Sequence, residues 1–234
     1  MRRGDEKRQA ILDVAEKLFY VKGYEATTVQ DILDVLGTSK GSFYHHFESK
    51  EQVLATLCTQ RAEKAVSYAR EQLAAVEAPL ERLNTVLSSA IPFRKGEEKF
   101  LSLFLPLLGR PEGLSLRVCY QDALRTGFLP LLTEEIAAGR QAGVVFSLDN
   151  ACLPGLVLEL TNHCWMDVAR ELLQAVSESR PLEPSALVEV LELYRFALER
   201  ILDAPFGSIS LIKVPQLIEI LRPVLLQLKL PMSL

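Results

Sequence analysis

The residues best suited to chemistry lie in one stretch near the start of the chain. From Ser39 to Lys50 it reads Ser-Lys-Gly-Ser-Phe-Tyr-His-His-Phe-Glu-Ser-Lys. Its hydroxyls, ammonium groups and imidazoles can donate hydrogen bonds to phosphate oxygens and base edges. Its small residues would allow a helix backbone to approach a groove closely. The stretch is therefore typical of a nucleic-acid contact surface, and a capped, solvated surface helix is the alternative interpretation.

The elements that must position these side chains are short helices. Thr28 and Asp31 have the spacing of a capping box at a helix start, and Gly37 stands where a helix should stop. Phe43 and Phe47, one helical turn apart, are expected to point into a core. Cap residues and apolar spacing predict helices over residues 5–22, 28–36, 38–46 and 49–76. The first three of these helices, with a glycine turn between the second and the third, form the helix-turn-helix arrangement.

The rest of the chain predicts a helical bundle. Prolines and apolar stripes mark helices at about 80–93, 97–109, 113–141, 151–178 and 184–203. The last two carry Leu and Val at the spacing of a helix-on-helix dimer seam, which an ordinary core would also show. A further apolar helical segment follows, in which Pro223 should kink or split the helix. It must pack on its own bundle or on a partner subunit.

These features predict an all-α chain of three parts. Residues 1–50 form a helix-turn-helix unit, residues 51–206 a helical regulatory and dimerisation domain, and residues 207–234 an additional C-terminal segment. Val144-Val145-Phe146 is the best strand candidate, but it is short and isolated. We therefore expect a loop there.

At this point the sequence resembles the tetracycline-repressor (TetR) family of bacterial transcription regulators over about residues 8–55. The resemblance rests on the aromatic and glycine that close the first helix, on Thr27-Thr28, and on the Ser-Lys-Gly-Ser-Phe-Tyr-His-His-Phe-x-x-Lys run. Thr38 and Leu36 depart from the family's usual residues without altering the groove-facing set. The resemblance implies a cytoplasmic all-α homodimer that binds a palindromic operator in double-stranded DNA, most often as a repressor.

Carried over position by position, the resemblance also implies the residues that touch DNA. They are Thr28, Ser39, Lys40, Ser42, Tyr44, His45 and Lys50. Tyr44 and Lys50 would contact phosphates, and Lys40 and His45 would read bases. The family further implies a C-terminal domain that binds a small effector, here expected to be lipophilic or aromatic, and then shifts the DNA-binding units apart.

Candidates for an effector pocket come from aromatic and polar residues on the later helices. They are Phe93, Phe100, Phe104, Cys119, Tyr120, Asn162, His163, Trp165 and Met166. Aromatics at helical spacing are also ordinary core residues, but a buried Asn or His needs a partner. His163 and Cys164 are helix neighbours that point about 100° apart, and no third ligand is evident, so we expect no metal and no cofactor.

Composition tests this interpretation. The 234 residues are 49% hydrophobic with a net charge of −4, which excludes disorder and, taken whole, disfavours a nucleic-acid binder. The first fifty residues, however, hold eight basic and eight acidic side chains, whereas residues 151–200 hold four and eight. The negative charge thus lies in the helices expected to form the dimer seam and the sensor. The basic cluster at residues 2–8 fits either a DNA-contacting arm or a solvated tail.

Other function classes remain as alternatives. No signal peptide or membrane span is expected, because the start is charged and the longest apolar run is short. The motif H-E-x-x-H and a phosphate-binding glycine loop are absent, so an all-α enzyme or a small-molecule carrier is a remote alternative. The nearer alternative is a TetR-like regulator switched by a protein partner or by thiol oxidation at one of four scattered cysteines.

Overall fold

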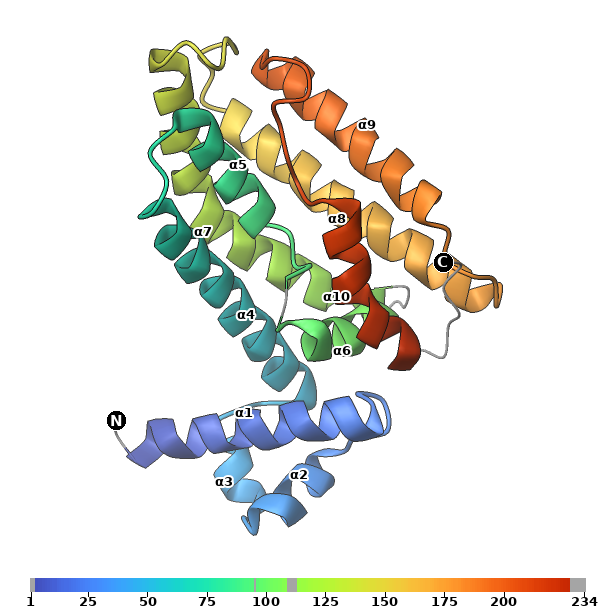
Figure 1. Cartoon of the computed structure of the whole chain (residues 1–234). Coiled ribbons are helices and arrows are strands. Elements are labelled where there is room, and N and C mark those ends of the chain that lie inside the picture. The colour runs from blue at the N-terminus through green and yellow to red at the C-terminus, as the bar shows by residue number, and fades with distance from the viewer. Residues whose placement is uncertain (1–2, 95, 109–112, 228–234) are drawn as a thin grey trace.

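The computed structural model describes residues 3–94, 96–108 and 113–227, and this part of the chain forms ten helices and no β-strand (Figure 1). They are α1 (Arg3–Lys22), α2 (Val29–Leu36), α3 (Lys40–Tyr44), α4 (Lys50–Leu73), α5 (Pro79–Ser89), α6 (Glu98–Leu108), α7 (Gly113–Gln141), α8 (Leu153–Ser177), α9 (Pro184–Leu202) and α10 (Val214–Gln227). The predicted all-α class is confirmed, and residues 144–146 lie in a loop, as expected.

Helices α1–α3 form a small N-terminal unit, here called the head. Its core contains the buried side chains of Phe19, Phe43 and Phe47, which the sequence pattern places inward. Gly37 has φ 59°, a left-handed conformation that lets the chain turn from α2 into α3 without a Cβ clash. Helix α3 ends at Tyr44, whereas we expect it to reach residue 46. Beyond Tyr44 the N–H of His46 donates to the third preceding residue, to Phe43 O at 2.8 Å, which is the tighter pattern of a 3₁₀ turn.

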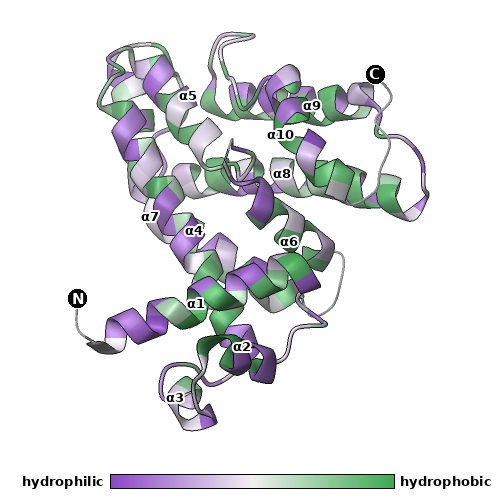
Figure 2. Cartoon of the chain, turned by 60° about the horizontal axis from the view of Figure 1, so that its bottom comes forward, coloured by the Kyte–Doolittle hydropathy of each residue, from purple (hydrophilic) through white to green (hydrophobic). Residues whose placement is uncertain are grey.

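Helix α4 joins the head to the other helices, here called the body (α5–α10). Figures 1 and 2 show α1–α3 at one end of α4. Helices α5, α7 and α8 lie beyond that end, alongside the rest of α4. The predicted domain boundary at residue 50 thus falls at the first residue of α4. Helix α4 packs closely against α7 of the body at Gly127, where a Cβ would lie 2.3 Å from Val66 Cγ2. A glycine is required there, because any larger side chain would push the two helices apart.

The C-terminal segment packs on its own chain. Residues 205–213, here called the strap, run from the end of α9 along the body to α10, which packs against α6 and α9 (Figure 1). Leu217, Leu221 and Val224 are fully buried there. Helix α10 continues through Pro223, so this proline does not split the helix. Residues 228–234 lie outside the described part of the chain.

Two hydrogen-bonded anchors hold the strap. The Asn84 side chain on α5 donates to Ser208 O at 2.8 Å and accepts from Ser210 N–H at 2.9 Å. The buried carboxylate of Glu199 on α9 accepts from Ile209 N–H at 3.2 Å and from Arg195 at 2.7 Å. Both anchors bind main-chain groups of the strap, so its path is determined by backbone hydrogen bonds.

An ion pair fastens α5 to α7 inside the body. Arg82 on α5 donates to both carboxylate oxygens of Glu135 on α7, at 2.8 and 2.6 Å, and the Glu135 side chain is 1% exposed. The same guanidinium donates to Leu73 O, at the end of α4, and to Val76 O, in the turn that follows α4. The hydrogen bonds to Glu135 raise the pKa of Arg82. One side chain therefore ties three helices together.

Within the described residues, no helix combines the length and the apolar character that crossing a lipid bilayer requires.

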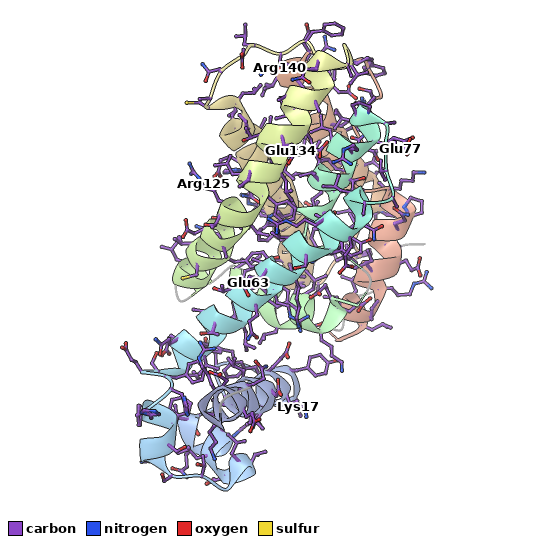
Figure 3. All side chains as sticks on the ribbon, turned by 90° about the vertical axis from the view of Figure 1, so that its left-hand side faces the viewer. Lys17, Glu63, Glu77, Arg125, Glu134 and Arg140 are labelled. Atoms are coloured by element: carbon purple, nitrogen blue, oxygen red, sulfur yellow. The ribbon has the colours of Figure 1, made fainter. Side chains whose placement is uncertain are left out.

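The Arg82–Glu135 pair generates a stability prediction. Replacing Arg82 with Met leaves the Glu135 carboxylate buried and uncompensated, which should lower the free energy of unfolding by about 3 kcal/mol. Urea denaturation at neutral pH measures this. Arg125→Met is the control, because Arg125 projects from α7 into solvent (Figure 3) and its loss should change stability by less than about 0.5 kcal/mol. Equal stabilities of the two variants would contradict the assigned role.

Candidate nucleic-acid interface

Helices α2 and α3 expose polar side chains at the end of the molecule farthest from the body (Figures 1 and 3). Lys40, Tyr44 and His45 are exposed on α3 and at its C-terminus, with Tyr44 55% exposed. The buried ring of Phe43 supports Tyr44 from behind, edge to face, at 5.4 Å between centroids. A rigid aromatic anchor thus presents a phenol, an ammonium and an imidazole outward, which suits contacts to phosphates and base edges.

The predicted contact residues Thr28 and Ser39 also cap helices. Thr28 Oγ1 accepts from Asp31 N–H at 3.1 Å, while the Thr28 N–H and hydroxyl both donate to Asp31 Oδ2 at 2.7 Å. Ser39 Oγ accepts from the N–H of Ser42 at 3.3 Å and caps α3. Thr28 thus directs both of its donors to Asp31, whereas the Ser39 hydroxyl proton is free to bind a partner such as phosphate.

The carboxylate of Asp31 is stabilised in its charged form. The Lys22 ammonium lies 2.7 Å from Asp31 Oδ1, and its hydrogen bond is the main reason that the pKa of Asp31 is well below its usual range. The Thr28 N–H and hydroxyl add to this effect. The capping box therefore stays intact far into the acidic range.

Lys50 faces the head rather than open solvent. Its ammonium donates to Tyr24 O at 2.9 Å and Thr27 O at 3.0 Å, and it lies 4.1 Å from the centroid of the Tyr24 ring. The Tyr24 hydroxyl donates to Glu51 Oε1 at 3.2 Å, and burial followed by the charge of Glu51 raises the pKa of Tyr24. Lys50 therefore clamps the start of α4 to the connection between α1 and α2, with one ammonium proton left over.

The structure places the predicted DNA-binding residues in two settings. Ser39, Lys40, Ser42, Tyr44 and His45 lie together on α3 and its caps, with Thr28 at the start of α2. Lys50 stands apart at the start of α4, where its ammonium already has partners. The roles of all seven in DNA contact stay predictions. No sequence signal points to the Lys50 clamp, because its partners lie more than twenty residues away.

The basic N-terminal cluster is partly used inside the fold. The Arg8 guanidinium lies 4.9 Å from the centroid of Phe47 and donates to Thr56 Oγ1 at 3.4 Å. Arg8 therefore packs α1 against α4 and is not a free arm. Arg2 lies outside the described residues.

A charged link that sequence reasoning missed connects head and body. Arg61 on α4 binds Glu16 on α1 through one guanidinium nitrogen and Glu97, just before α6, through another at 2.9 Å. The Arg61 side chain is 18% exposed and lies 5.7 Å from the ring centroid of Phe100. Burial disfavours its charge, but the two carboxylates outweigh this and raise its pKa. One cation therefore contacts the head, α4 and the start of α6.

Four of the predicted effector-pocket residues pack together in the body. The rings of Phe100, Phe104, Tyr120 and Trp165 have centroids 5.0 to 6.2 Å apart, and all four are buried. Asn162, one turn from Trp165 on α8, is fully buried, and neither polar atom of its amide has a partner. The indole N–H of Trp165 also has none. Buried polar atoms without a partner require an explanation, and a bound ligand is one such explanation.

The other predicted pocket residues lie elsewhere. Phe93 lines a separate cavity beside α5, and Cys119 is exposed at a cleft between α4 and α7. His163 is exposed, with Nδ1 2.8 Å from Glu159 O, and Met166 is only half-buried. The structure thus does not bring the nine residues into one cavity, because neighbours on α8 point to different sides of the helix.

Comparison with known proteins identifies the head. Residues 11–57 match the family model described as bacterial regulatory proteins, tetR family. The chain is 50% identical over 48 residues to the HTH-type transcriptional repressor KstR2 of Rhodococcus jostii, covering 20% of this chain and 24% of that protein. It is 37% identical over 79 residues to KstR2 of Mycobacterium tuberculosis, covering 34% and 40%. The chain thus spans well under half the length of these curated relatives.

Solved structures extend the likeness of the fold to the body. A putative TetR-family regulator from Syntrophomonas wolfei has a TM-score of 0.57 at 20% identity, covering 84% of this chain and 96% of that one. FadR of Bacillus subtilis, in complex with stearoyl-CoA, has a TM-score of 0.55 at 18% identity, covering 86% and 99%. A putative regulator from Saccharomonospora viridis, in complex with choline, has a TM-score of 0.56 at 21% identity, covering 83% and 96%.

These proteins are regulators, and their family is not one of enzymes. The head thus matches the tetR family of bacterial regulatory proteins over residues 11–57, and the chain shares the all-α fold of solved TetR-family regulators.

Proposed function

We propose that this protein is a cytoplasmic repressor that binds a palindromic DNA operator as a homodimer and releases it when a small molecule binds the body. The observation that carries the proposal is the outward set Ser39, Lys40, Tyr44 and His45 on α3, held on a packed head. Tyr44 and Ser39 would contact phosphates, and Lys40 and His45 would read bases. The names of the curated relatives, which are HTH-type transcriptional repressors, support the proposal.

Dimerisation is supported by an apolar outer face on α8 and α9. Leu156 on α8 is 49% exposed, and Leu193 and Phe196 on α9 are 63% and 50% exposed. The two helices are fastened side by side, with Tyr194 OH donating to Asp167 Oδ2 at 2.7 Å. Exposed apolar side chains on paired helices favour a second copy of the same pair as the partner, since a closed two-fold interface buries both sets.

A small effector is supported by the aromatic cluster in the body. The orphaned amide of Asn162 and the indole of Trp165 would hydrogen-bond its polar part, while Phe100, Phe104 and Tyr120 would contact its apolar part. Two structural neighbours hold stearoyl-CoA and choline, so this fold accommodates small ligands. Phe100 also lies beside Arg61, so a ligand that displaces Phe100 would disturb the contact between Arg61 and Glu16 of the head.

Thiol oxidation is the less favoured switch. Burial raises the pKa of Cys58 and of Cys164 to about 12, which keeps both thiols protonated and unreactive at neutral pH. Cys119 is exposed on α7, and Cys152 is exposed at the N-cap of α8. Neither pair supports a built redox site.

The base-reading role of α3 can be tested by operator selection from randomised DNA. Lys40→Ala should change the preferred sequence, and each lost base contact should cost about 1–3 kcal/mol of binding. Tyr44→Phe should weaken binding to all sequences alike, because phosphates carry no sequence information. Lys17→Ala, on α1 (Figure 3), is the control and should leave the preference unchanged. An unchanged preference in Lys40→Ala would refute base reading by Lys40.

Lys50 should act both as a clamp and as a phosphate ligand. Lys50→Met removes charged hydrogen bonds to Tyr24 O and Thr27 O, so the free energy of unfolding should fall by about 1.5–3 kcal/mol. The slope of log K against log salt for operator binding should also fall by about one unit. Thermal unfolding and fluorescence anisotropy measure the two effects separately. A normal melting temperature would exclude the clamp, and an unchanged slope would exclude the phosphate contact.

The dimer face can be tested by light scattering. Placing charges at its centre, as in Leu193→Asp with Phe196→Asp, should convert the dimer to monomers and reduce operator affinity by at least tenfold. Val21→Asp is a matched control, because Val21 is 81% exposed at the end of α1, away from α8 and α9. A double variant that remains dimeric would show that another surface joins the subunits.

A further inference from the structure

A cavity of about 490 Å³ lies on the side of the body where α5, the strap and the start of α10 meet. Its volume is within the range of about 300–1,000 Å³ that small-molecule sites occupy. Of the residues in the aromatic cluster, none lines it, and among the residues singled out by the sequence pattern only Phe93 does. The cavity is therefore separate from the site proposed for the effector.

One wall of the cavity carries a cation that is incompletely bonded. Arg94, between α5 and α6, lines the cavity with its guanidinium carbon 5.3 Å from the ring centroid of Tyr68. Its Nε is buried and has no hydrogen-bond partner. A buried guanidinium N–H without an acceptor is costly, and guanidinium groups bind carboxylates and phosphates through strong charge-assisted hydrogen bonds.

Two carboxylates and one ammonium also line the cavity, so the carboxylates must be held by other partners if the Arg94 guanidinium is to bind an added anion. Glu98 accepts from Gly96 N–H at 3.0 Å, and Glu219 is engaged in a contact of its own. Lys213, at the end of the strap, brings a second positive charge to the lining. The carboxylates thus have partners, whereas Arg94 Nε does not.

The remaining wall is apolar. Phe93, Leu211 and Ile220 line the cavity and are almost completely buried. A ligand with a hydrocarbon body would pack against these side chains, whereas an inorganic anion would not. The chemistry of the walls therefore requires an acidic group at one end of the ligand and an apolar chain or ring at the other.

The strap forms the outer boundary of this cavity. Ser210, Leu211 and Ile212 line it, and the two hydrogen bonds of Asn84 hold this part of the chain against α5. Because Asn84 also lines the cavity, a ligand and the strap share one polar anchor. Occupancy of the cavity should therefore depend on an intact strap.

We propose that this cavity, built by Arg94, Asn84 and the strap, is a second binding site that takes a small monocarboxylate with an apolar body.

Titration calorimetry on the full chain with three matched probes tests the proposal. Octanoate, octanol and octylammonium share one hydrocarbon chain and differ in the charge of the head group. Octanoate should bind with a stoichiometry of one per chain and at least tenfold more tightly than the other two. Equal affinity of the three probes, or tighter binding of octylammonium, would overturn the assignment, as would the absence of heat with octanoate.

Variants locate the bound probe. Arg94→Met should weaken octanoate binding about tenfold or more, Arg94→Lys should weaken it less, and Asn84→Ala should weaken it by releasing the strap. Ser88→Phe should abolish binding by filling the cavity from α5. Arg125→Met, on the exposed side of α7, is the control and should bind as the original chain does. Circular dichroism confirms that each variant is folded before titration.

Two outcomes would show that the probe binds elsewhere. If Arg94→Met and Ser88→Phe both bind octanoate normally, the cavity is not the site. If Trp165→Leu alone abolishes binding, the probe occupies the aromatic cluster. The titrations contain no DNA, so their result is independent of operator binding, and failure of either proposal leaves the other standing.

Discussion

The structure depends on one cation that lies between its two parts. Arg61 occupies the middle of α4, and its guanidinium is held by Glu16 of the head and Glu97 of the body while it remains largely shielded from water. A shielded guanidinium is stable only while its carboxylates stay in place. Any shift of α6 that withdraws Glu97 therefore changes the balance at Glu16 as well. The position of the head is in this way tied to the packing of the helices that surround Phe100.

Much of the fold could be predicted because its signals are local. The capping box of Thr28 and Asp31, the left-handed Gly37 and the turn-spaced Phe43 and Phe47 act within a few residues of each other, and each has its expected structural role. The helices of the body follow equally from their apolar stripes and prolines. The exposed set on α3 follows from the same local geometry.

The long-range contacts could not be predicted in this way. Arg61 meets residues 45 and 36 positions away, and Asn84 meets the strap more than 120 positions later. No periodicity encodes such pairs, since they depend on how helices pack in three dimensions. The same limit explains the effector candidates. Asn162, His163, Trp165 and Met166 on α8 are all candidates from the sequence, whereas only Asn162 and Trp165 are buried in the structure.

Polar groups in this molecule serve structure and recognition at once. Thr28 directs both of its donors into a cap, and Lys50 directs most of its hydrogen-bonding capacity into the junction of head and α4. Asn162 and Arg94 Nε are the reverse case, because they are buried and lack partners. Residues of the first kind stiffen the end of the molecule that carries α3, and those of the second kind mark the places in the body where a ligand would add stability.

The way in which Asn84 holds the strap has an evolutionary consequence. Its amide recognises the carbonyl of Ser208 and the N–H of Ser210, groups that every residue other than proline possesses. Exposed side chains of the strap, such as Ser210, are therefore free to change while the chain keeps its path, whereas Ile209 and Leu211 are buried. Descendants of this protein could acquire new side chains over the same cavity without first losing the framework, so the strap is where the chemical preferences of related regulators would be expected to diverge first.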